Sequence, residues 1–228
     1  MIFGPSLLDV ERVSARALEL RSVRLNLSQF ECLPIVELLE FDITEIFRDF
    51  VLIVAEDWPL RREAILAFSR LNPPQIVVRE SIYCDAVDGI SYARFVLAHE
   101  LGHIYLSHHK DDEDRWRGEC ASSLEWEADE FASELLMPSQ AVQMLAHRMT
   151  ISDFAARFKV SPGFAERRIN LLRERDKKYK LLLEQEDPVS LRSPLKESFW
   201  ANSQLGDYIV TELSRLDVVG AFDKLPRH

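Results

Sequence analysis

The sequence predicts an α+β fold, in which a small β-sheet precedes two helices and a set of shorter helices follows them. Two runs rich in β-branched residues, 50–55 and 75–80, are typical of buried strands. Apolar residues recur at helical spacing in 6–22 and in 122–135, and the run 94–99 is compatible with a helix and apolar up to its histidine. Two or three strands are expected ahead of the helix that contains residues 94–103, and they fit a small sheet that packs on that helix.

The first part of the chain is expected to hold short helices and the strands. Residues 6–22 fit an amphipathic helix, and residues 33–39 fit a second, short one. Strand 50–55 is bounded by acidic residues. Residues 63–68 are expected to form a short helix, which an Asn-Pro-Pro sequence stops before strand 75–80.

The next helix carries the most informative feature of the chain, the sequence His-Glu-Leu-Gly-His at 99–103. Residues four apart on a helix lie nearly above one another, so His99 and His103 present their imidazoles from one face, as two ligands of a tetrahedral metal. Glu100 lies about 100° round the helix axis, where it can reach a water molecule without being a ligand. This HExxH arrangement is typical of zinc peptidases, in which the glutamate is the general base.

The surroundings of this motif support a buried helix. Residues 95–98 are apolar, Ser91 is expected to cap the helix, and the helix should run to about His108. Gly102 costs about 1 kcal/mol relative to alanine in a helix interior, which indicates a close approach to its backbone. His108 and His109 are off the ligand face, and we interpret them as surface histidines at the helix end, with oxyanion donation as the alternative.

A catalytic zinc usually takes a third protein ligand, which is expected on the following helix. That helix should begin near Ser122, because Ser122 and Glu125 form a capping-box pattern, and it should stop at Pro138. The capping pattern gives Glu125 another role, and helical phase points Asp129 and Glu130 away from the apolar stripe. Periodicity leaves two candidates that it cannot separate, Glu127 and Glu134.

A family resemblance separates them. Residues 94–103, RFVLAHELGH, and residues 127–138, EADEFASELLMP, resemble the paired motifs of the ImmA/IrrE metallo-endopeptidases over roughly residues 75–172. The resemblance implies a zincin-like domain in which His99, His103 and Glu127 bind Zn²⁺ and Glu100 is the base. Phe131 stands where thermolysin-like enzymes place an aspartate that supports a metal-binding histidine, so the acceptor for His99 stays unassigned.

Residues 140–172 are expected to form three short helices. Residues 154–161 resemble a stretch of helix-turn-helix units, which the ImmA/IrrE family usually carries here, and Arg167 and Arg168 near the start of the last helix could meet a major groove. The favoured interpretation is a subdomain that packs on the peptidase domain, because the chain carries a net charge of −10 and DNA affinity is mainly electrostatic. Docking of a protein substrate is a third possible use.

Cysteine content and the distribution of apolar residues indicate the expected compartment of the protein. The three cysteines, Cys32, Cys84 and Cys120, have no CxxC spacing and fit reduced thiols in a cytosolic protein. We expect no signal peptide and no membrane span, because the start lacks a basic region and the longest apolar run is too short. The expected location is therefore the cytoplasm.

Together these patterns predict a zinc metallopeptidase domain over 1–138, a helix-turn-helix-like helical subdomain over 139–175, and a linker with a C-terminal helical tail over 176–228. The predicted function is zinc-dependent, site-specific cleavage of a protein. The resemblance implies a helix-turn-helix repressor as substrate, in a prokaryotic, phage or mobile-element setting. The alternative is a metal-containing transcriptional regulator or interaction module without proteolytic activity.

Overall fold

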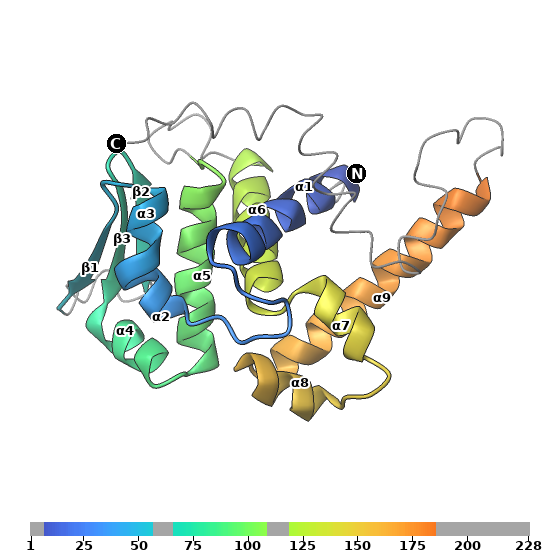
Figure 1. Cartoon of the computed structure of the whole chain (residues 1–228). Coiled ribbons are helices and arrows are strands. Elements are labelled where there is room, and N and C mark those ends of the chain that lie inside the picture. Colours follow the sequence, from blue (N-terminus) through green and yellow to red (C-terminus); the bar gives the residue numbers. More distant parts are fainter. Residues whose placement is uncertain (1–6, 57–65, 109–118, 186–228) are drawn as a thin grey trace. The chain divides into compact units, whose positions relative to one another are not determined.

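The fold is a mixture of one three-stranded sheet and many helices, seen in a computed structural model that describes residues 7–56, 66–108 and 119–185 (Figure 1). The predicted α+β class is thus confirmed in outline. Contacts divide the chain into a compact unit up to Leu172 and a second unit from Arg173 onward. Residues 139–172 therefore belong to the same compact unit as the two long helices. Of the predicted linker and helical tail over 176–228, the part after residue 185 lies outside the described residues, as does His109.

The sheet has the strand order β1-β3-β2. Strand β3 (Pro74–Arg79) is central; it pairs in parallel with β1 (Val51–Ala55) and antiparallel with β2 (Ala67–Leu71). Ile76 and Val78 of β3 are fully buried, because they face the helices that cover one side of the sheet. The apolar runs predicted as strands at 50–55 and 75–80 correspond to β1 and β3.

One prediction in this region was wrong, and one helix was not predicted. Ala67 and Phe68, expected at the end of a helix, lie in β2, where they pair with Val78 and Val77. A short apolar run does not distinguish a helix from a strand, and pairing with β3 decides for the strand. Helix α4 (Glu80–Val87), which was not predicted from the sequence, follows β3 directly.

Helices α5 (Ser91–Tyr105) and α6 (Glu119–Leu136) run side by side at the centre of the compact unit, and α1 (Leu7–Glu19) packs on α6 (Figure 1). Gly102 explains the closeness of α5 and α6: a Cβ built on it would lie 3.2 Å from the Cα and the carbonyl oxygen of Ala128. The close approach predicted from this glycine is confirmed. Short helical segments link α1 to the sheet: η1 (Leu20–Arg24), α2 (Ile35–Glu37), η2 (Leu38–Asp42) and α3 (Ile43–Ile46).

Three further helices follow α6: α7 (Ser139–Leu145), α8 (Ile151–Phe158) and α9 (Pro162–Gln185). Arg168 of α9 is buried and forms ion pairs with Glu130 and Glu134 of α6, the first at 2.8 Å. Burial alone would lower the pKa of Arg168, but the two carboxylates outweigh it and raise that pKa. The expectation that Arg168 could meet a DNA groove is therefore wrong, because its guanidinium is enclosed between helices, whereas Arg167 is exposed.

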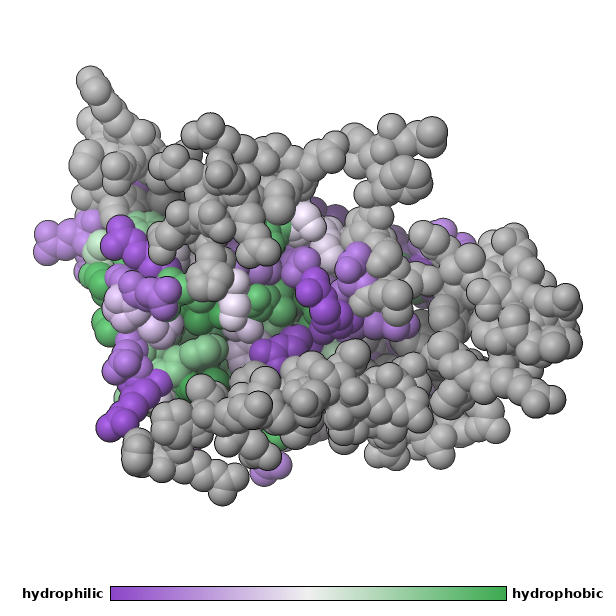
Figure 2. Space-filling view, turned by 90° about the horizontal axis from the view of Figure 1, so that it is seen from above, coloured by the Kyte–Doolittle hydropathy of each residue, from purple (hydrophilic) through white to green (hydrophobic). Residues whose placement is uncertain are grey.

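Part of the exposed apolar surface lies on the sheet. Val51, Ile53 and Val54 of the edge strand β1 are among the exposed large apolar side chains, and Figure 2 shows hydrophobic surface at the end of the molecule where the sheet lies. Among the described helices, none combines the length and the apolar character that crossing a membrane requires.

Candidate metal centre

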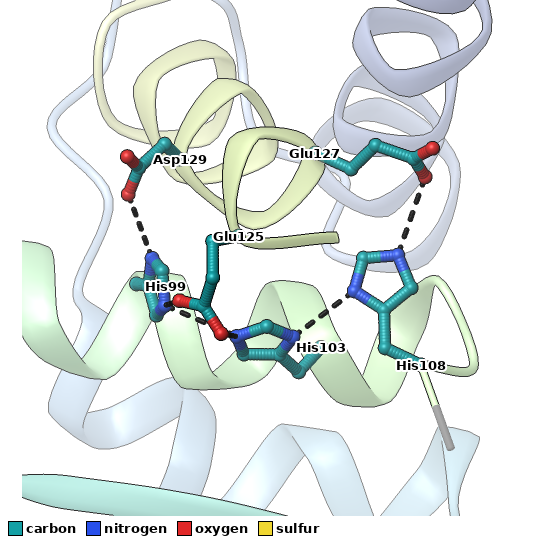
Figure 3. Close-up of polar contacts among 6 residues, drawn as sticks. All are labelled: His99, His103, His108, Glu125, Glu127 and Asp129. Atoms are coloured by element: carbon teal, nitrogen blue, oxygen red, sulfur yellow. Dashed lines mark hydrogen bonds and ion pairs between the residues drawn. The ribbon is translucent and has the colours of Figure 1, made fainter. Parts of the chain in front are cut away.

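Three side chains from α5 and α6 converge on one point (Figure 3). The Nε2 atoms of His99 and His103 lie 3.1 Å apart. A carboxylate of α6, that of Glu125, lies 3.1 Å from Nε2 of His99 through one oxygen and 3.5 Å from Nε2 of His103 through the other. Within the described part of the chain, these three residues form the cluster that could hold a metal ion.

The spacing of these atoms fits zinc. Zinc binds histidine nitrogen and carboxylate oxygen at about 2.0–2.2 Å in a tetrahedron, which separates neighbouring ligand atoms by about 3.3 Å. The three measured separations, 3.1, 3.1 and 3.5 Å, surround that value. The donor set of two imidazoles and one carboxylate is also one that catalytic zinc sites use.

The third member of the cluster is Glu125, whereas the family resemblance implied Glu127. Glu125 and Asp129 are one turn apart on the face of α6 that meets His99, and Glu127 is turned from Glu125 by about 200°. Glu127 instead contacts His108 at 3.2 Å and Arg12 at 2.8 Å. The capping role that had set Glu125 aside is wrong, because α6 begins at Glu119 and Ser122 lies inside it.

Opposite charges and hydrogen bonds hold the three side chains of the cluster together. Burial tends to lower the pKa of His99, but hydrogen bonds to Asp129 and Glu125 outweigh it and raise that pKa to about 9. Hydrogen bonds to His103 and His99 hold the pKa of Glu125 well below its usual range. The site thus offers an ionised carboxylate. A metal ion that displaced the proton from His99 would lie next to the carboxylates of Glu125 and Asp129.

Both histidines have a partner on their second ring nitrogen. His99 places Nδ1 2.8 Å from Asp129, which supplies the acceptor that the sequence had left unassigned. His103 places Nδ1 3.0 Å from Nδ1 of His108. His108 is buried, so its interpretation as a surface histidine is wrong. Partners of this kind orient metal-binding imidazoles.

Two further residues from the sequence prediction, Glu100 and Glu134, lie in different places. Glu100 follows His99 on α5; it is buried, and its charge acts on His99. Glu134 does not approach the cluster; it accepts hydrogen bonds from the backbone N–H and the hydroxyl of Ser139, both at 2.9 Å, and pairs with Arg168. The signal that could have identified Glu125 is its spacing of four residues from Asp129, which places two carboxylates on one helix face.

A comparison with known proteins identifies the family of the region that bears the cluster. Residues 63–170 match the family model of IrrE N-terminal-like domains, peptidase family M78. The match includes both helices that bear the cluster and excludes α1. No curated protein matches the chain.

Proposed function

Residues 63–170 are an IrrE N-terminal-like domain of a metallopeptidase family, and from this premise we propose that the protein is a zinc-dependent endopeptidase. The observation that carries the proposal is the convergence of His99 and His103 of α5 with Glu125 of α6. Helix α5 also bears Glu100. An HExxH glutamate beside a two-histidine, one-carboxylate site is the arrangement expected for hydrolysis of peptide bonds.

Each residue then has a separate role. His99 and His103 contribute one Nε2 atom each to the metal, and Glu125 contributes a carboxylate oxygen. A bound Zn²⁺ supplies Lewis acidity, which polarises the scissile carbonyl and lowers the pKa of the attacking water toward about 7. Glu100 is not a member of the ligand cluster; it would act as the general base that takes a proton from the attacking water and passes it to the leaving amine.

The proposed substrate is a protein cut at one site, as part of regulation. Resemblance to the ImmA/IrrE family supports a helix-turn-helix repressor, whose cleavage would switch on the genes under it. Co-expression with a small helix-turn-helix protein from a neighbouring reading frame tests this: the proposal expects a shortened repressor with the parent protein and an intact one with Glu100→Gln. An intact repressor in both would contradict this substrate.

One pair of substitutions tests the site itself. Glu125→Gln and Glu100→Gln are the same chemical change at two acids, one on α6 and the other on α5. Glu125→Gln should lose most bound zinc, because two histidines alone fall below the three protein ligands of catalytic zinc sites. Glu100→Gln should keep one zinc per chain but lower cleavage by about 10²–10⁴, the usual contribution of general acid–base catalysis.

The readouts are zinc per chain after equilibrium dialysis and the rate of substrate cleavage. Normal zinc content in Glu125→Gln would remove Glu125 from the ligand set. Full cleavage by Glu100→Gln at normal zinc content would remove Glu100 from the mechanism.

A further inference from the structure

A line of polar contacts leads from His103 away from the metal cluster through His108 to Glu127 (Figure 3), and continues to Arg12 of the N-terminal helix. His103 Nδ1 lies 3.0 Å from Nδ1 of His108, and His108 Nε2 lies 3.2 Å from a carboxylate oxygen of Glu127. Arg12 of α1 donates to the other oxygen of Glu127 at 2.8 Å. The three inner members are shielded: His103 and His108 are buried, and the side chain of Glu127 is 14% exposed. The line therefore connects the metal cluster to a part of the chain that precedes the family match.

Metal binding sets the direction of every hydrogen bond in this line. When Nε2 of His103 holds a metal, the hydrogen of its ring must be on Nδ1, so that Nδ1 donates to His108. Nδ1 of His108 then has to accept, which places the hydrogen of that ring on Nε2, and Nε2 donates to Glu127. The carboxylate of Glu127 accepts from His108 on one oxygen and from Arg12 on the other. No contact in the line has two donors or two acceptors facing each other.

The backbone after α5 is shaped to bring His108 back over His103. The N–H of His108 donates to the carbonyl of His103 at 2.8 Å, and the N–H of Ser107 donates to that of Ile104 at 3.0 Å. Ser107 takes the left-handed conformation, with φ 57°, a position that glycine usually occupies at the end of a helix. This turn reverses the chain within two residues and returns the imidazole of His108 to the helix that it has just left.

The two ligand histidines are thus supported in different ways. Asp129 accepts directly from His99, whereas a second imidazole stands between His103 and its carboxylate. We propose that His108 and Glu127 are positioning residues of the metal site, which hold His103 in the tautomer and orientation that bind zinc, and that Arg12 orients Glu127. This inference rests on the proposed zinc site, and it gives Glu127 a role in that site other than ligation.

Substitutions at His108 test the inference. His108→Phe keeps a ring of similar shape but removes both nitrogens. His108→Asn keeps a side-chain oxygen close to the position of Nδ1, so it can still accept from His103. Loss of such a partner typically weakens metal binding by about 10–100-fold. We expect His108→Phe to raise the zinc Kd by about that factor and His108→Asn to restore part of the affinity.

The outer members of the line should have graded effects. Glu127→Gln, which replaces one oxygen with an amide donor, should also raise the zinc Kd but still bind one zinc at saturation, unlike Glu125→Gln. Arg12→Gln should have a smaller effect than Glu127→Gln, because the side chain of Arg12 is 60% exposed. Arg16→Gln is the matched control: Arg16 lies one turn further along α1 and pairs with Glu19, so the zinc Kd should not change.

Three measurements separate positioning from a purely structural role: the zinc Kd by competition with a chelating indicator, the visible spectrum of the cobalt-loaded protein at saturation, and the melting temperature of the chelated protein. Positioning predicts weaker zinc binding and an altered cobalt spectrum in His108→Phe, with partial recovery of both in His108→Asn. Unchanged affinity and spectrum in His108→Phe, or changes that only follow the melting temperature of the chelated protein, would overturn the inference and leave the zinc site standing. A parent protein that binds no zinc would overturn both this inference and the proposed function.

Discussion

Replacing Gly102 with alanine tests whether the closeness of α5 and α6 assembles the metal site. A Cβ at this position would lie 3.2 Å from the Cα and the carbonyl oxygen of Ala128, and also 3.2 Å from Cδ1 of Phe131. Two of these three atoms are backbone, so they can withdraw only if α6 itself shifts. Ordinary contact begins at 3.4 Å, which requires a displacement of a few tenths of an ångström.

The effect on stability is the difference between two opposing contributions. Alanine is favoured over glycine in a helix interior by about 1 kcal/mol, whereas an extra methyl group in a well-packed core costs about 1–3 kcal/mol. The free energy of unfolding of the zinc-free protein should therefore fall by about 0–2 kcal/mol.

Zinc binding should respond more strongly than folding. A metal site tolerates ligand displacements of only about 0.2 Å, and a shift of α6 carries Glu125 away from the two histidines. If zinc must restore the original approach of the helices, the full packing cost of about 1–3 kcal/mol opposes binding, which corresponds to a zinc Kd raised by about 5- to 150-fold.

Gly163→Ala is the matched control. Gly163 also lies in a helix, but a Cβ there would meet nothing within 4 Å. This variant should be as stable as the parent protein or more stable, by up to about 1 kcal/mol, and should bind zinc equally well. Urea unfolding of the chelated proteins and zinc competition give both quantities. A zinc Kd for Gly102→Ala equal to that of Gly163→Ala would refute the argument that helix contact at Gly102 sets the position of Glu125.

Further predictions concern the metal and the helices after α6. Removal of zinc with a chelator should lower the melting temperature, since a ligand at 100 times its Kd stabilises the folded state by about 2.7 kcal/mol; equal melting curves with and without zinc would contradict specific binding. Arg168→Gln should lower the free energy of unfolding by about 3–5 kcal/mol, because it leaves two buried carboxylates of α6 without their cation, whereas the adjacent exposed change Arg167→Gln should alter it by no more than about 0.5 kcal/mol; equal effects in urea titrations would show that the ion pairs carry no stability. Thr150→Ala should cost about 1 kcal/mol, because the hydroxyl of Thr150 caps α8 by accepting from the N–H of Asp153 at 3.2 Å. Hydrogen bonds from Thr150 lower the pKa of Asp153, so the contribution of its carboxylate is present above about pH 4 and is lost as the pH falls further, and the variant should lose less stability than the parent protein below that pH.

The sequence by itself determined the chemistry of the first metal-bearing helix. The spacing of His99 and His103 and the position of Glu100 follow from helical geometry, which is local and needs no knowledge of the rest of the fold. Gly102 likewise indicated that another part of the chain approaches its backbone closely, but the sequence did not identify that part. The strands at 50–55 and 75–80 could be predicted because short runs rich in β-branched residues are typical of buried strands.

Only the tertiary structure decided which residues on other elements meet that helix. Candidate acids on α6 differ in helical phase relative to α5, and the sequence of α6 alone does not give that phase, because it arises from the packing of the two helices, which approach closely at Gly102 and Ala128. The apolar stripe pointed to Glu127 or Glu134, but Glu125 is the acid of α6 that lies beside the two histidines. The partners of Glu127 are equally non-local: a turn after α5 returns His108 to the site, and Arg12 comes from more than a hundred residues away in the chain. Spacing along one helix is a property of the chain, whereas contacts between helices arise only when the whole core has packed.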